Sequence, residues 1–169
     1  MKEVVLEVYD KLIYDIVGAA HEVHNELHYG LSEAIYEESL CIELNEKWLE
    51  ASHQIDLPVF YKDHQLEKHY RMDLLVENMV LIELKAVDTI LPEHRAQLFN
   101  YLRITHMPIG LLINFGKSVY VEKYFYNEST NEIAFLHTRK AKSEYVDDWR
   151  QWTLLLVDNL RQFKTIFEG

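Results

Sequence analysis

Three charged side chains interrupt an otherwise apolar part of the sequence. Asp73 precedes the segment 74–76, and Glu83 and Lys85 lie within the segment 80–87. Apolar runs of this kind are typical of strands in a protein core, where a charge is costly unless it pairs or binds a metal ion. We therefore expect these three residues to form the functional site.

The length of one turn decides whether the three side chains meet. Glu83 and Lys85 are two residues apart, so they share one face of a strand. If residues 77–79 form a three-residue turn, Asp73 lies opposite Glu83 on that face, and Arg71 lies opposite Lys85. A turn of two or four residues would place Asp73 and Glu83 on opposite faces.

Two neighbouring carboxylates suggest a metal site. They repel each other, and a divalent cation removes the repulsion. Mg²⁺ prefers oxygen ligands and takes one or two carboxylates, together with water and substrate phosphate oxygens. Lys85 could orient water or stabilise negative charge that develops at phosphorus. The alternative interpretation is an exposed salt bridge, but the apolar residues on both sides favour a site.

The spacing of apolar residues predicts an α/β chain with a mixed sheet. Helices are expected over 5–28, 32–50, 92–106 and 143–167, and strands over 54–61, 66–76, 80–87, 107–115, 119–126 and 132–138. The segments 80–87 and 107–115 are apolar on both faces, which predicts central strands. The intervening helix predicts that these two strands form a parallel pair.

Single residues refine this arrangement. Pro58 predicts an edge strand or an irregular pairing. Cys41, the single cysteine, is expected to be a small core residue. The second helix is predicted to bury three aliphatic residues, with other apolar residues beside them: Ile35, Ile42 and Leu49, flanked by Tyr36, Leu40 and Leu44.

Composition limits the class of protein. The 169 residues are 49% hydrophobic, which indicates a real core and a single domain over 1–169. No apolar run is long enough to cross a bilayer, and residues 1–20 lack a signal-peptide pattern. A cytoplasmic protein without a membrane partner is expected, because the sequence also offers no disulfide framework.

The net charge of −11 is concentrated near the N-terminus, where residues 1–57 hold 3 basic and 13 acidic residues. An acidic protein is a poor general binder of polyanions. Nucleic-acid binding would therefore need local cations, for which Arg71, Arg95 and Arg103 are candidates, or the help of a basic partner protein.

A histidine-rich stretch in the first helix invites a zinc interpretation. His24 and His28 have the spacing of helical zinc ligands. Zinc peptidases place a glutamate directly after the first histidine, but Asn25 occupies that place here. Zinc catalysis is therefore disfavoured.

Three motifs resemble one known family. Residues 30–36, with Gly30, Glu33 and Tyr36, match a GxxExxY signature. Asp73 and the triplet 83–85 match the D…ExK core of the PD-(D/E)xK nuclease superfamily, and residues 97–102 resemble its QxxxY helix. The chain resembles GxxExxY proteins over about residues 8–125, with 126–169 as a C-terminal extension.

The resemblance implies a restriction-endonuclease-like fold, with a mixed central sheet flanked by helices and a C-terminal hairpin and helix. It implies binding of Mg²⁺ or Mn²⁺ by a set of oxygen ligands: Asp73, Glu83, the backbone carbonyl of Leu84, and Glu33 as a nearby helix acid. It also implies that Lys85 acts on water and that Gln97 positions this lysine or the substrate.

Several further residues belong to the expected site or to the family pattern. Substrate contacts are expected from three side chains, Arg71, Tyr36 and Tyr101. Glu22 and His24 also match a family pattern in the first helix, without an assigned role.

Two functions are expected from these observations. The first is a metal-dependent nuclease that hydrolyses phosphodiester bonds, with DNA favoured over RNA as the substrate. The second is a catalytically silent interaction module that binds a protein partner or forms a homodimer through the aromatic C-terminal helix. Tyr145, Trp149 and Trp152 would then form the contact surface, whereas in the first case they cover the core.

Overall fold

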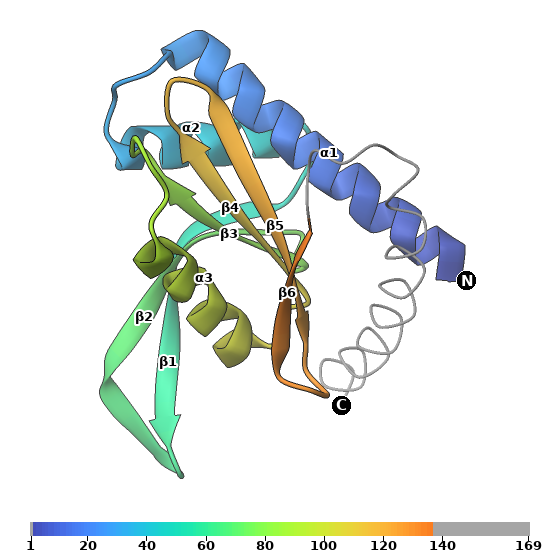
Figure 1. Cartoon of the computed structure of the whole chain (residues 1–169), viewed down its shortest axis with the longest axis vertical. Helices are drawn as coiled ribbons and strands as arrows, with labels where there is room; N and C mark the ends of the chain where they lie inside the picture. The colour runs from blue at the N-terminus through green and yellow to red at the C-terminus, as the bar shows by residue number, and fades with distance from the viewer. Residues whose placement is uncertain (1, 137–169) are drawn as a thin grey trace.

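A computed structural model describes residues 2–136 (Figure 1). Its elements, in chain order, are α1 (Lys2–Leu27), α2 (Glu33–Glu46), β1 (Ala51–Tyr61), β2 (His64–Val76), β3 (Val80–Lys85), α3 (Pro92–Thr105), β4 (Ile109–Phe115), β5 (Val119–Asn127) and β6 (Glu132–Leu136). Within residues 2–136, no helix is long and apolar enough to span a bilayer. The helix predicted over 143–167 lies outside the described residues.

The six strands form one mixed sheet in the order β1-β2-β3-β4-β5-β6. Strands β3 and β4 are parallel and are joined through α3, while the other neighbouring pairs are antiparallel. The predicted central strands and their parallel pairing are therefore confirmed. The predicted α/β class with a mixed sheet is confirmed as well.

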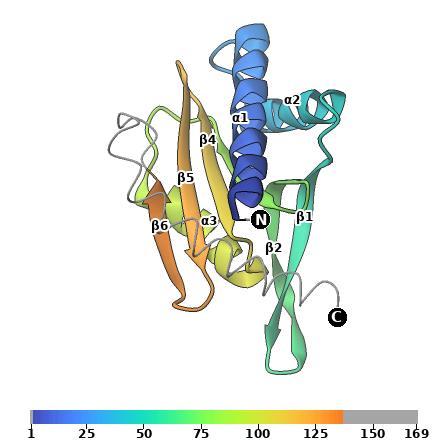
Figure 2. The same ribbon diagram turned by 90° about the vertical axis from the view of Figure 1, so that its right-hand side faces the viewer.

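Helices cover both faces of the sheet (Figure 2). Helices α1 and α2 pack on the face to which β3 contributes Val80, Ile82 and Leu84. Helix α3 packs on the opposite face, around Leu81. Because side chains alternate along a strand, Glu83 shares the α3 face with Leu81.

Helix α2 is rotated relative to the prediction. Ile35 and Ile42 are 44% and 54% exposed, so their predicted burial is wrong. The buried side chains of this helix are Tyr36, Glu37, Leu40, Cys41 and Leu44. The buried face includes the large ring of Tyr36, which stacks on Phe115 with ring centroids 4.7 Å apart. The expected burial of Cys41 is confirmed.

Strands β1 and β2 continue beyond the rest of the sheet. Strand β2 pairs with β3 only over Leu74–Val76, whereas its pairing with β1 extends to the turn at 62–63. We call residues 55–72 the β1–β2 arm (Figure 1). Among the described strands, β1 lies at one edge of the sheet, and its register shifts between Pro58 and Phe60, which confirms the prediction made from Pro58.

An ion pair between a half-buried arginine and a buried glutamate joins α3 to β5. The Arg95 guanidinium donates two hydrogen bonds to the Glu122 carboxylate, at 2.8 and 2.9 Å, and the Tyr120 and Tyr124 hydroxyls donate to the same carboxylate at 2.7 and 2.6 Å. Burial alone would raise the pKa of Glu122, but these bonds outweigh it and lower the pKa. Arg95, expected as a cation for nucleic acid, is thus engaged within the fold.

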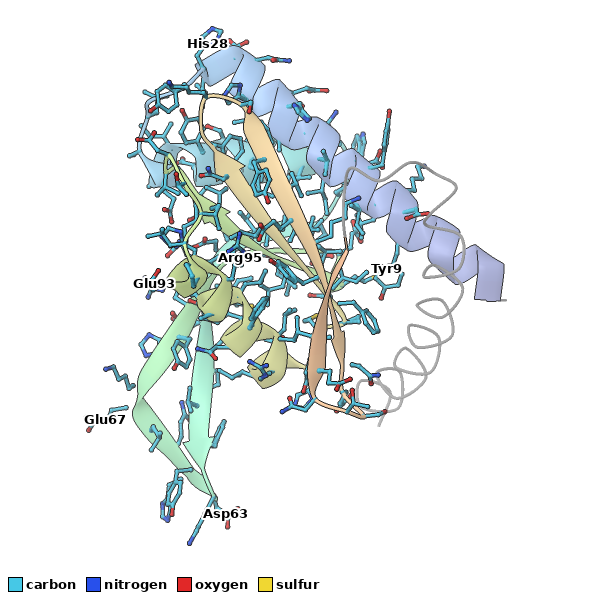
Figure 3. All side chains as sticks on the ribbon, in the orientation of Figure 1. Tyr9, His28, Asp63, Glu67, Glu93 and Arg95 are labelled. Atoms are coloured by element: carbon cyan, nitrogen blue, oxygen red, sulfur yellow. The ribbon has the colours of Figure 1, made fainter. Side chains whose placement is uncertain are left out.

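Glu122→Gln is expected to lower the free energy of unfolding by about 1–3 kcal/mol, because it leaves the Arg95 charge without its partner. Urea unfolding at pH 7 measures this. Glu93→Gln is the control, since Glu93 is exposed in the first turn of the same helix (Figure 3). An equal effect of the two substitutions would contradict the role given to the ion pair.

Candidate functional site

The turn between β2 and β3 has the length that the site requires. Residues 77–79 form a three-residue turn, and Val76 pairs with Val80. The same register pairs Leu74 with Ile82, so its next step places Asp73 opposite Glu83. The predicted three-residue turn is confirmed, and the two carboxylates share one face of the sheet.

Asp73 is bound to the backbone of β3. Its side chain is buried, and Oδ2 accepts a hydrogen bond from the Leu84 amide at 2.7 Å. Burial raises the pKa of Asp73 to about 6. The Leu84 amide opposes this rise, whereas the charges of Glu37 and Glu33 add to it. The hydrogen bond to Leu84 therefore holds the Asp73 carboxylate beside the segment 83–85.

Glu83 is the least satisfied polar group of the described residues. Its side chain is 1% exposed, and neither carboxylate oxygen has a hydrogen-bond partner within the described part of the chain. Lys85 Nζ lies 3.1 Å from Oε1 as an ion pair without hydrogen-bond geometry. Burial, and next the charge of Asp73, raise the pKa of Glu83 to about 8. Buried carboxylates are rarely left in this condition.

Helix α3 holds Lys85 from the other side. Lys85 Nζ donates a hydrogen bond to Gln97 Oε1 at 3.1 Å, and Gln97 Nε2 donates to the Tyr101 hydroxyl at 2.8 Å. Gln97 and Tyr101 are four residues apart, so they lie on the same side of the helix. The structure therefore brings these residues together in the way expected for a QxxxY helix.

Lys85 is a cation in this environment. Burial by itself disfavours the ammonium, but the charges of Glu83, Glu33 and Asp73 outweigh burial, and the pKa of Lys85 is raised. The side chain therefore supplies positive charge next to the two carboxylates and does not act as a base.

Glu33 begins α2 and lies beside this group. Burial raises its pKa, and the charge of Lys85 opposes the rise. Nowhere in residues 2–136 do three or more His, Cys, Asp or Glu side chains form a group with the geometry to hold a metal ion. The structure therefore brings Asp73 and Glu83 together but does not add Glu33 as a third carboxylate ligand.

Glu37 is a neighbour of the site that the sequence reasoning missed. It is 5% exposed, accepts a hydrogen bond from Gln54 Nε2 at 2.6 Å and lies 3.4 Å from His53 Nδ1. Its charge acts on Asp73. Its position four residues after Glu33, on the same side of α2, was the signal that could have identified it.

Two expected substrate contacts lie in the core. Tyr36 is fully buried, its hydroxyl donates to the His28 carbonyl, and the Leu31 amide donates to that hydroxyl at 3.2 Å. Tyr101 is 2% exposed. The predicted substrate contact of Tyr36 is therefore wrong, because this side chain is buried and binds the backbone of the α1–α2 turn. Tyr101 is also buried, and its hydroxyl accepts a hydrogen bond from Gln97.

Arg71 does not pair with Lys85 as expected. The described pairing of β2 with β3 ends at Leu74. Arg71 instead lies at the exposed base of the β1–β2 arm, where Nε donates to Asp56 Oδ1 at 2.9 Å. Arg71 remains accessible to a ligand, but it is not part of the row formed by Asp73, Glu83 and Lys85.

The residues of α1 that matched a family pattern make structural contacts. His24 Nε2 donates to the Gly116 carbonyl at 2.9 Å, which ties α1 to the turn after β4. Glu22 accepts a hydrogen bond from Lys47 Nζ at 2.9 Å. His24 and Glu22 therefore each join α1 to another part of the described structure.

Comparison with known proteins gives one informative match. A family model for the PD-(D/E)XK nuclease superfamily matches residues 10–125. Curated proteins gave no match. Among solved structures, the chain resembles the crystal structure of SSO0001 with a TM-score of 0.44 and 16% sequence identity, over 78% of this chain and 58% of that chain. The chain thus spans little more than half of that protein.

Proposed function

We propose, from the premise that this chain belongs to the PD-(D/E)XK nuclease superfamily, that it hydrolyses phosphodiester bonds in nucleic acid, with DNA as the substrate. Nucleases of this superfamily generally use divalent metal ions. The observation that carries the proposal is the buried Glu83 carboxylate, which has no hydrogen-bond partner among the described residues and lies beside Asp73. The Lys85 ammonium offsets only one of the two carboxylate charges, so the pair still requires a further cation or a proton.

The donors at this position suit Mg²⁺ or Mn²⁺. Asp73 and Glu83 offer the hard oxygen ligands that Mg²⁺ prefers, and two carboxylates are the usual number. We infer that these carboxylates and the backbone carbonyl of Leu84 would hold the ion. When bound, a divalent ion supplies charge that polarises phosphate oxygens and lowers the pKa of water.

Lys85 supplies the second positive charge of the site. Gln97 fixes its ammonium, and Tyr101 fixes Gln97. A donor held in advance stabilises charge at a phosphate without reorganisation during the reaction. Glu33 adds to the raised pKa of Lys85, so we assign Glu33 the role of keeping the lysine protonated.

We also infer the finer placement in the GxxExxY family, because each residue of the motif has a physical role. Gly30 adopts a φ of 107°, which favours glycine. Glu33 begins α2, and Tyr36 binds backbone groups of the turn. The motif thus presents Glu33 to the site.

Cleavage assays test the proposed function directly. Labelled duplex DNA, single-stranded DNA and RNA would be incubated with the full chain in Mg²⁺, Mn²⁺ or EDTA. Cleavage of duplex DNA with metal and none with EDTA is expected. Equal cleavage by a Lys85→Ala variant purified in parallel would assign the activity to a contaminant and contradict the proposal.

The metal-free protein is expected to lose stability as the pH rises from about 4.5 to 8. A carboxyl group whose pKa is raised on folding binds more protons in the folded state, so its contribution to stability falls above the unfolded pKa. Asp73, raised to about 6, and Glu83, raised to about 8, both act in this direction. Thermal unfolding in EDTA at several pH values measures the fall.

Added Mn²⁺ should reverse this loss, because binding to the folded state stabilises it. The rise in melting temperature is expected to be larger at pH 8 than at pH 5.5, where the carboxyl groups bind protons instead. A rise that is equal at both pH values would show that the metal acts elsewhere.

A further inference from the structure

The β1–β2 arm is exposed on both of its strands. All residues from 61 to 71 are exposed, and Asp63 marks the tip of the arm, away from the helices (Figure 3). Over residues 55–72 the two strands pair only with each other. The arm projects from the body in both ribbon views (Figures 1 and 2). An isolated two-stranded ribbon is marginally stable in water, so its length calls for an explanation.

The surface of the arm combines apolar rings with cations. Phe60 and Tyr61 are 59% and 62% exposed, and Tyr70 is 43% exposed. Lys62 is exposed at the tip, and Lys68 is exposed about midway along the arm. Phe60 and Tyr61 lie next to the tip and Tyr70 lies at the base, so exposed rings occur at both ends of the arm and offer contact surface to a ligand.

The charge distribution makes the arm less repulsive to a polyanion than α1 and α2 are. Residues 1–50, which form α1 and α2, hold 3 basic and 12 acidic residues, whereas the arm holds 3 basic and 3 acidic residues as well as two histidines. Most of the net charge of −11 therefore belongs to α1 and α2. The arm is a surface from which nucleic acid is not repelled.

The base of the arm is connected to the site. Asp73 follows the arm directly on β2. The ring of Tyr70 contacts that of Tyr101 edge-on, with centroids 5.8 Å apart, and the Tyr101 hydroxyl accepts the hydrogen bond from Gln97, which holds Lys85. Nucleic acid bound by the arm would thus be positioned relative to Lys85.

The dimensions of the arm match those of a duplex. Asp73 lies nine residue steps after His64, which at ~3.3 Å per step gives about 30 Å. This length is close to one turn of B-DNA, about 34 Å. The major groove, about 12 Å wide, admits a two-stranded β-ribbon.

From these observations we propose that the β1–β2 arm is the surface that binds duplex DNA on one side of the bond to be cleaved, with the ribbon in a groove and Lys62 and Lys68 on the phosphates. This inference rests on the proposed function, and it identifies a surface with which an acidic nuclease could bind its polyanionic substrate.

The test measures binding of a fluorescent duplex of about 24 base pairs, two turns long, by anisotropy in EDTA, where hydrolysis does not contribute. In one variant of the full chain, residues 59–68 are replaced by Asn-Gly, which joins the paired residues Pro58 and His69 by a two-residue turn. Its affinity is expected to fall at least about 10-fold, while thermal unfolding shows that the body stays folded.

A second variant leaves the ribbon intact. Lys68→Glu is expected to weaken binding about 5-fold and to make its salt dependence shallower by about one unit of slope. Lys11→Glu is the matched control, because Lys11 is an exposed lysine on α1, and it should change affinity less than about twofold. An equal loss in both variants would indicate a general charge effect and overturn the proposal.

The remaining outcomes distinguish duplex DNA from single-stranded nucleic acid and from a second copy of the chain as the ligand of the arm. Duplex affinity that is unchanged after shortening the arm overturns the proposal, as does an arm that supports only self-association in light scattering. If shortening the arm lowers the affinity for single-stranded DNA as much as the affinity for duplex DNA, the assignment of the arm to a duplex groove is overturned. A wild-type chain that binds duplex through the arm but never cleaves it with metal would contradict the proposed function and leave the arm assignment standing.

Discussion

Glu83→Gln is expected to make the metal-free protein more stable at pH 8 and to abolish metal-dependent cleavage. The carboxylate is buried, lacks hydrogen-bond partners among the described residues and faces Asp73. Removing its charge removes the cost of ionising it, on the order of 2 kcal/mol. A gain of that size raises the melting temperature by about 4–8 °C.

The matched comparison is Glu122→Gln, the same chemical change at a glutamate that is almost equally buried, 2% exposed against 1%. Glu122 has a guanidinium and two hydroxyl groups as partners, so its substitution should destabilise. Urea unfolding of both variants in EDTA at pH 8 compares them directly. Destabilisation of similar size in both variants would show that Glu83 is an ordinary structural glutamate.

The same Glu83→Gln protein should lose cleavage by about 10³-fold, because a neutral amide is a poor ligand for a divalent cation and the charge acting on phosphate disappears. Mn²⁺ should also no longer raise its melting temperature. A variant that is stabilised yet still cleaves DNA would show that the Glu83 carboxylate is not needed for catalysis.

Lys85→Met is expected to lower kcat by about 10²–10³-fold, the usual effect of removing one preorganised group that stabilises transition-state charge. The affinity for duplex DNA should change little, because the Lys85 side chain is only 13% exposed and lies between Glu83 and Gln97. Single-turnover cleavage measures the rate, and anisotropy measures the affinity.

Two controls define the role of Lys85. Lys11→Met removes an exposed lysine of α1 and should leave both quantities unchanged. Lys85→Arg keeps the charge and should retain more activity than Lys85→Met. If Lys85→Met lost affinity and kept kcat, the lysine would be a binding residue and the assignment to transition-state stabilisation would be wrong.

The local part of the site could be predicted because it depends on neighbouring residues. A three-residue turn at 77–79 places Asp73 opposite Glu83, since side chains alternate with a period of two along each strand. Gln97 and Tyr101 could likewise be placed together, because residues four apart share one side of a helix.

Other features depend on contacts between distant segments. The buried face of α2 includes Tyr36, which stacks on Phe115, a residue of β4. The periodicity of α2 alone did not identify the buried face of this helix, because Ile35 and Ile42 offered an alternative apolar face. The engagement of Arg95 by Glu122 similarly requires α3 and β5 to be adjacent.

The sequence by itself determined the order of helices and strands, the central position of β3 and the residue types that could bind a cation, because these follow from local periodicity and side-chain chemistry. Only the tertiary structure decided which charges are satisfied. It left Glu83 without hydrogen-bond partners among the described residues, paired Glu122 and extended the arm beyond the sheet. Burial and pairing depend on which distant segments pack together, and no local pattern specifies that.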